Sequence, residues 1–142
     1  MTRRQSILFR VIFYTYLAAV ALLCFGNFSS APSVDLSFFG IPTDKIVHFC
    51  MFFPFPVLAF LAFDKYTETA RTSFIFVGAT FIAGCLLAVI TEIGQAKLTT
   101  YRSGDARDFL ADFIALALSS LLILYIDLRK QHKKNEAVPS EN

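Results

Sequence analysis

Residues 73–91 of the chain read SFIFVGATFIAGCLLAVIT, nineteen positions without a charged side chain. A helix rises about 1.5 Å per residue, so this stretch would extend about 28 Å, close to the roughly 30 Å thickness of a bilayer's hydrocarbon core. The whole chain shares this character, since 56% of its 142 residues are hydrophobic and only 17% are charged. A soluble domain of this length could not bury so much apolar surface in one core. The sequence therefore predicts an integral membrane protein.

Three further windows are long and apolar enough to span a bilayer, at about residues 7–26, 45–63 and 107–126. The last window needs an argument, because its uninterrupted apolar part would give only about 21 Å of helix. The helix must therefore begin earlier and carry Asp108 and Asp112 in its first turns. We predict an all-α fold, a four-helix transmembrane bundle in which residues 1–142 form a single membrane domain. Proline at two positions in the second window, Pro54 and Pro56, predicts a kink there.

Basic residues between the spans indicate how the chain is oriented. Nine lysines and arginines lie before or just inside the start of the first span, between the second and third spans, and after the fourth, against four in or directly beside the other two loops. Because basic segments favour the cytoplasmic side, we expect both termini in the cytoplasm, with residues 127–142 as a polar cytoplasmic tail. A cleaved signal peptide is the competing interpretation of residues 7–26, but that apolar stretch exceeds the usual length of such a segment.

Polar and ionisable side chains gather at the outer end of three of the predicted spans. Such groups are costly within a membrane, so each of them needs a reason. The spacing of the three aspartates near the start of the fourth span places them within one arc of that helix. We therefore expect the spans to converge on one candidate site at the outer mouth of the bundle. Its members are Asp44, Lys45, His48, Glu92, Gln95, Arg102, Asp105, Asp108 and Asp112.

Each of these residues also has an ordinary structural interpretation. Asp44 follows Pro42-Thr43 and could simply cap the helix that begins there. His48 could be a buried histidine with satisfied hydrogen bonds. Since the spans contain a single histidine, a zinc site is poorly supported, and we assign no metal ligand or cofactor from the sequence.

Three short elements of this cluster resemble the signature of the VanZ-like family. Residues 44–49, DKIVHF, resemble its D-K-x-x-H-F motif; residues 92–95, EIGQ, resemble E-x-x-Q; and residues 102–112 resemble R-x5-D-x3-N. Two positions depart from the pattern, because Asp112 stands where the family usually has Asn and Ala115 where it usually has Gly. The resemblance implies a small multi-pass protein of the bacterial plasma membrane. The family is named for a member associated with resistance to teicoplanin, a lipoglycopeptide.

Three functions are compatible with this site. In the first, the cluster binds an amphiphile such as a lipid-linked envelope precursor or a lipoglycopeptide, and basic side chains meet its anionic groups. In the second, the protein is an enzyme in which His48 or Glu92 is a general base, while Asp108 and Asp112 hold a divalent cation. A transporter is disfavoured, because the inner halves of the spans contain almost no polar groups. The expected partners are membrane lipids and such an amphiphile, and nothing indicates nucleic-acid binding.

Overall fold

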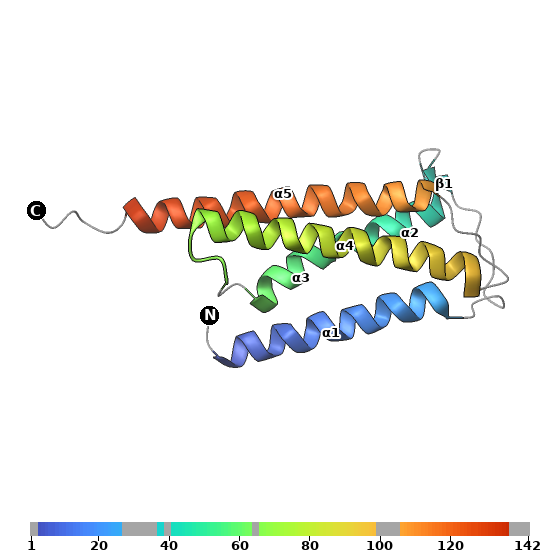
Figure 1. The fold of residues 1–142 in the computed structure, drawn as a ribbon, viewed down its shortest axis with the longest axis horizontal. Coiled ribbons are helices and arrows are strands. Elements are labelled where there is room, and N and C mark those ends of the chain that lie inside the picture. The colour runs from blue at the N-terminus through green and yellow to red at the C-terminus, as the bar shows by residue number, and fades with distance from the viewer. Residues whose placement is uncertain (1–2, 27–36, 39–40, 64–65, 99–105, 137–142) are drawn as a thin grey trace, which may run out of the picture.

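The computed structural model describes residues 3–26, 37–38, 41–63, 66–98 and 106–136. The elements in chain order are α1 (Arg3–Phe25), β1 (Ser37–Phe38), β2 (Ile41–Pro42), α2 (Thr43–Phe52), α3 (Pro54–Phe63), α4 (Ala70–Leu98) and α5 (Ala106–Glu136). Helices α2 and α3 form one span, so four segments are long and apolar enough to cross a membrane. The predicted all-α four-helix bundle is confirmed (Figure 1). The two short strands pair in antiparallel register just before α2.

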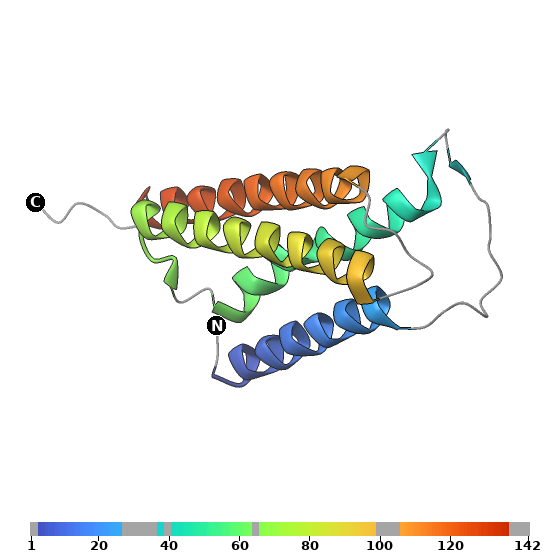
Figure 2. The same cartoon turned by 45° about the vertical axis from the view of Figure 1, so that its right-hand side comes forward.

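The four spans alternate in direction, so that α1 begins and α5 ends at the same end of the bundle (Figure 1). We call this the tail end. The opposite end, where α2 begins, α4 ends and α5 begins, is the mouth end. Helices α4 and α5 lie side by side along most of their length. The α2–α3 span runs obliquely from the start of α5 toward α1 (Figure 2).

The second span is interrupted at Phe53, between α2 and α3, directly before the prolines that predict a kink, and Phe53 itself keeps helical backbone angles (φ −57°, ψ −40°). The amide of Phe53 still donates to the carbonyl of Phe49 at 2.9 Å. Proline at the next position has no amide hydrogen, and its ring clashes with the preceding turn, so the regular ladder stops there. Next to the break, the hydroxyl of Tyr16 in α1 donates to the carbonyl of Met51. The interruption lets α2 pack mainly against α5 while α3 packs mainly against α1.

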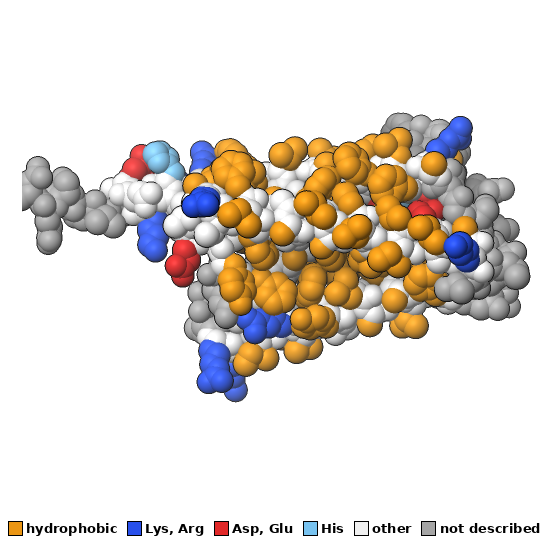
Figure 3. Space-filling model, in the orientation of Figure 1, with side chains coloured by type: hydrophobic (Ala, Val, Ile, Leu, Met, Phe, Trp, Pro, Cys, Tyr) orange, Lys and Arg blue, Asp and Glu red, His pale blue; other side chains and the backbone are white. Residues whose placement is uncertain are grey.

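Aromatic and small apolar side chains fill the bundle interior. Phe13 of α1 lies against Phe55 and Phe63 of α3, with ring centroids 5.7 and 5.8 Å apart. Phe52 and Leu116 have no exposed surface at all. In contrast, hydrophobic side chains cover much of the outside as a broad band, with lysines and arginines toward both ends (Figure 3). An exposed band of this kind is typical of a protein that faces lipid.

Helix α5 continues well past its predicted end near residue 126, as far as Glu136. Part of the predicted polar tail is therefore helix, and residues 137–142 lie outside the described residues. The reason is a polar network at the tail end. Asp127, only 6% exposed, accepts hydrogen bonds from Ser73 Oγ at 2.6 Å and Gln131 Nε2 at 3.1 Å, and Gln131 also donates to the Thr67 carbonyl. This network fastens α5 at Asp127 and Gln131 to the start of α4 and to Thr67 just before it.

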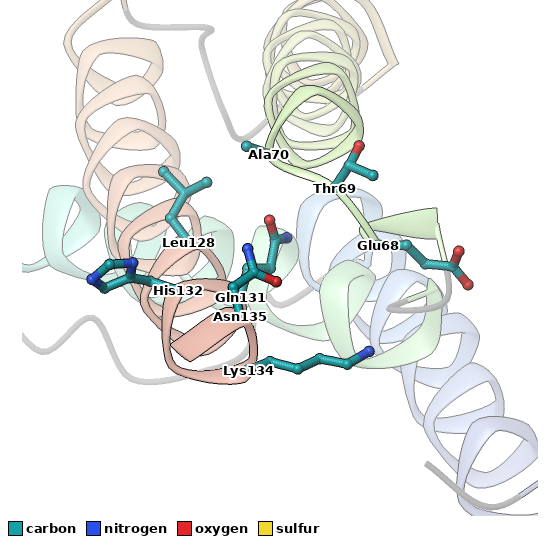
Figure 4. A pocket seen from close by; sticks show the side chains of 8 residues that line it. All are labelled: Glu68, Thr69, Ala70, Leu128, Gln131, His132, Lys134 and Asn135. Atoms are coloured by element: carbon teal, nitrogen blue, oxygen red, sulfur yellow. The ribbon is translucent and has the colours of Figure 1, made fainter. Parts of the chain in front are cut away.

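Beside this network, the start of α4 and the end of α5 enclose a hollow of about 400 Å³ at the surface of the tail end. Polar side chains from α5 and from Glu68 and Thr69, just before α4, line it, and the side chain of Lys134 extends across its edge (Figure 4). Of the lining residues, His132 is an exposed side chain, with its Nε2 3.2 Å from Glu136 one helical turn later. Hydropathy alone predicts neither the network nor the hollow.

Two glycines of α4 offer a matched test of the packing between α4 and α5. A Cβ atom added at Gly84 would lie 2.6 Å from Cδ2 of Leu116, whose side chain is fully buried, and 3.2 Å from Phe55. A Cβ atom at Gly78 would meet nothing within 4 Å. We expect Gly84→Ala to lower the free energy of unfolding by about 1–3 kcal/mol through overpacking. Gly78→Ala should be neutral or slightly stabilising, since alanine favours the helix.

The measurement is thermal unfolding of the two variants and the wild type, purified in the same detergent. Equal melting temperatures for Gly84→Ala and Gly78→Ala would show that α4 and α5 do not approach as closely as the structure has them.

Candidate functional site

The centre of the candidate site is a contact between His48 of α2 and Asp112 of α5. Both side chains are buried, with His48 1% exposed and Asp112 fully enclosed. Nδ1 of His48 lies 3.1 Å from Oδ1 and 3.3 Å from Oδ2 of Asp112. A carboxylate without such a partner would be very costly at this depth, so the contact holds the start of α5 against α2.

A series of charged side chains leads from this contact to the surface of the mouth end. Nε2 of His48 faces Oδ2 of Asp108, 3.8 Å away. The other oxygen of Asp108, Oδ1, forms an ion pair with Nζ of Lys45. Lys45 in turn lies 2.9 Å from Oδ2 of Asp44, whose side chain is 48% exposed. Acidic and basic groups therefore alternate from the enclosed Asp112 to the exposed Asp44.

Helix α4 adds a further carboxylate to this group. Glu92 is 9% exposed, and its Oε1 lies 3.7 Å from Nδ1 of His48. Small side chains let the helices come this close, since Ala88 of α4 and Ala115 of α5 are both fully buried. Three helices that are distant in sequence thus meet at one histidine. We call these residues the mouth cluster: Asp44, Lys45, His48, Glu92, Asp108 and Asp112.

The predicted convergence of three spans is confirmed for these six residues. Gln95, also predicted, is buried on α4 one turn after Glu92, at 2% exposure. Arg102 and Asp105 lie outside the described residues. The sequence suggested Asp108 and Asp112 as a pair that holds a cation. The structure instead places Asp112 at Nδ1 of His48 and Asp108 at Nε2.

The mouth cluster has two chemical capacities. A carboxylate bound to one ring nitrogen fixes the orientation of an imidazole, which is a common arrangement for general bases and for metal-binding histidines. In addition, one ligand atom from each of His48, Glu92 and Asp108 lies within 4.8 Å of the other two. These three side chains are the described residues that could hold a metal ion, because imidazole and carboxylate are both common metal ligands.

Comparison with known proteins adds no relative to this picture. No protein-family model, no curated protein and no solved structure matches the chain. The fold and site therefore define a class only, a multi-pass membrane protein of four spans with an acidic, histidine-centred cluster at one end.

Two substitutions at Asp112 test the contact with His48. Asp112→Asn keeps an oxygen that can accept a hydrogen bond from Nδ1, so we expect little change in stability. Asp112→Ala removes the acceptor and leaves a buried ring nitrogen without its partner, which costs about 1–3 kcal/mol before any cavity is counted. The measurement is thermal unfolding in detergent at neutral pH. An Asn variant as unstable as the Ala variant would show that the negative charge, as half of an ion pair with protonated His48, is what the fold requires.

Proposed function

We propose that the chain is a VanZ-like protein of the bacterial cell envelope that binds the polar head of an amphiphilic envelope component through the mouth cluster. The class of ligand is a lipid-linked envelope precursor or a lipoglycopeptide, and the role is binding or accessory. Support comes from the three sequence elements of the family signature and from the contacts that join two of them. His48 from the first element lies against Asp112 from the third.

The observation that supports this proposal most directly is the continuous series of polar contacts that runs from Asp112 to Lys45 and Asp44 at the surface. An amphiphile in a bilayer keeps its chains among the lipid tails and its head near the interface, which is the depth of the mouth end. The ammonium group of Lys45, whose side chain is 14% exposed, can meet a phosphate or carboxylate of that head. The carboxylates of the cluster can accept hydrogen bonds from sugar hydroxyls or peptide amides.

The proposed location is the plasma membrane, with both termini in the cytoplasm and the mouth cluster outside. Two observations support it. The segments that hold nine of the thirteen lysines and arginines all lie toward the tail end or continue from it. In addition, α1 begins and α5 ends at that same end (Figure 1). The mouth cluster then faces the side on which envelope precursors are assembled into the cell wall.

A catalytic role is the second candidate, and the contact between Asp112 and His48 favours it. A buried carboxylate that orients an imidazole is a common general base, and Nε2 of His48 would take the proton from a water or hydroxyl. Phosphate release from a polyprenyl pyrophosphate distinguishes this role from binding alone. A transporter receives less support, because α5 buries Leu116 and Ile123 between the mouth cluster and the network at Asp127.

Binding is tested with the full chain in lipid nanodiscs, using a polyprenyl pyrophosphate and teicoplanin as separate probes. Lys45→Gln should raise the Kd of the pyrophosphate probe at least tenfold, since a hydrogen bond to a charged group contributes about 1.5–3 kcal/mol. The matched control is Lys97→Gln, which removes an exposed lysine from the last turn of α4 at the same end. Saturable binding of neither probe, or equal losses in the two variants, would contradict the proposal.

A further inference from the structure

We propose that His48, Glu92 and Asp108 form a binding site for a divalent transition-metal ion. The three side chains come from α2, α4 and α5, and the ligand atoms lie within 4.8 Å of one another. Metal bonds to nitrogen and oxygen are about 2.0–2.2 Å long, so ligands of one ion stand about 3–4 Å apart. The three side chains would therefore have to draw closer together to coordinate an ion.

The orientation of His48 is the second observation that points to a metal. Asp112 lies at hydrogen-bond distance from Nδ1, so Nε2 is the nitrogen available to an ion. Metal-binding histidines usually have this arrangement, with a carboxylate at the far ring nitrogen that fixes the ring and increases its basicity. Nε2 faces Oδ2 of Asp108, the oxygen that Lys45 does not bind. Lys45 thus fixes the other half of the same carboxylate.

The carboxylates of Asp108 and Glu92 both approach the imidazole of His48, each beside a different ring nitrogen. Oδ2 of Asp108 lies 3.8 Å from Nε2 of His48, whereas Oε1 of Glu92 lies 3.7 Å from Nδ1, so Glu92 must turn toward Nε2 to share an ion with the other two ligands. Both distances are too long for a hydrogen bond. The side chains of His48, Asp108 and Glu92 are only 2%, 10% and 11% exposed, so the carboxylates approach the imidazole in a region largely removed from water. A divalent cation at this point would offset the cost of burying two negative groups beside each other.

The ligand set favours one class of metal. Mg²⁺ and Ca²⁺ prefer sites built only of oxygen ligands, whereas a set of one imidazole and two carboxylates suits Zn²⁺ or Mn²⁺. Three protein ligands would leave coordination positions for water or for a ligand at the mouth. Binding of such an ion by the purified protein does not depend on any amphiphile, so this proposal and the proposed function can fail separately.

The test uses the full chain in detergent, stripped of metal with EDTA and titrated with Mn²⁺ while electron paramagnetic resonance records the free ion. We expect one saturable site, from which Zn²⁺ displaces Mn²⁺ and an equal concentration of Mg²⁺ does not. Asp108→Asn and Glu92→Gln should each raise the Kd at least about tenfold, since even outer partners of a metal site contribute that much. The matched control is Asp127→Asn, because Asp127 is an equally buried carboxylate on the same helix, 6% exposed against 7% for Asp108.

Thermal unfolding provides the second measurement and shows whether each variant is folded. Saturating Zn²⁺ should raise the melting temperature of the wild type and of Asp127→Asn, but not that of Asp108→Asn, because an ion that binds only the native state stabilises it. If Asp108→Asn does not fold because its contact with Lys45 is lost, Glu92→Gln tests the same metal site without removing that contact. Absence of saturable Mn²⁺ and Zn²⁺ binding by the wild type, or equal Kd values for Asp108→Asn and Asp127→Asn, would overturn the proposal.

Discussion

A carboxylate with no exposed surface inside a membrane-spanning helix is the constraint on which the rest of this structure depends. Asp112 cannot remain there without a partner, and His48 supplies one at 3.1 Å. The contact requires α2 to lie against the start of α5. The interruption at Phe53 then allows the remainder of the span, α3, to turn away and pack against α1. The interruption before the prolines and the candidate site are thus two parts of one arrangement.

Small side chains along α5 make the site possible and separate it from the opposite end. Ala115 is fully buried, and Ser119 donates its hydroxyl back to the carbonyl of Ala115 at 2.8 Å, so this hydroxyl needs no partner on another helix. This close packing brings Glu92 of α4 to His48. Beyond it, Asp127 belongs to a second network that joins α4 and α5 at the tail end. Polar contacts therefore fasten the bundle at both ends, and apolar packing fills the part between.

Hydropathy and helical phase are enough to predict the four spans and the residues that face inward at the mouth. They cannot predict which atoms pair, because that depends on how side chains from three helices are oriented together. Asp112 and Asp108 share one helical face, yet they lie at opposite nitrogens of His48. The sequence also does not predict how far α5 extends. Its pattern makes Asp127 the first residue of a polar tail, and only the fold shows that Ser73 of α4 donates a hydrogen bond to it. The single histidine argues against a zinc site in the sequence, whereas the fold brings carboxylates of Glu92 and Asp108 close to that histidine.

The central claim is that Nδ1 of His48 donates a hydrogen bond to Asp112. A measurement of which ring nitrogen of His48 carries the hydrogen tests this claim most directly. The chain has only two histidines, so ¹⁵N-histidine labelling gives a nuclear magnetic resonance spectrum in which exposed His132 is an internal reference. The account predicts a hydrogen on Nδ1 of His48 whose signal shifts in Asp112→Ala, while the signals of His132 stay unchanged. A neutral ring with its hydrogen on Nε2 and a bare Nδ1, unaffected by that substitution, would contradict it.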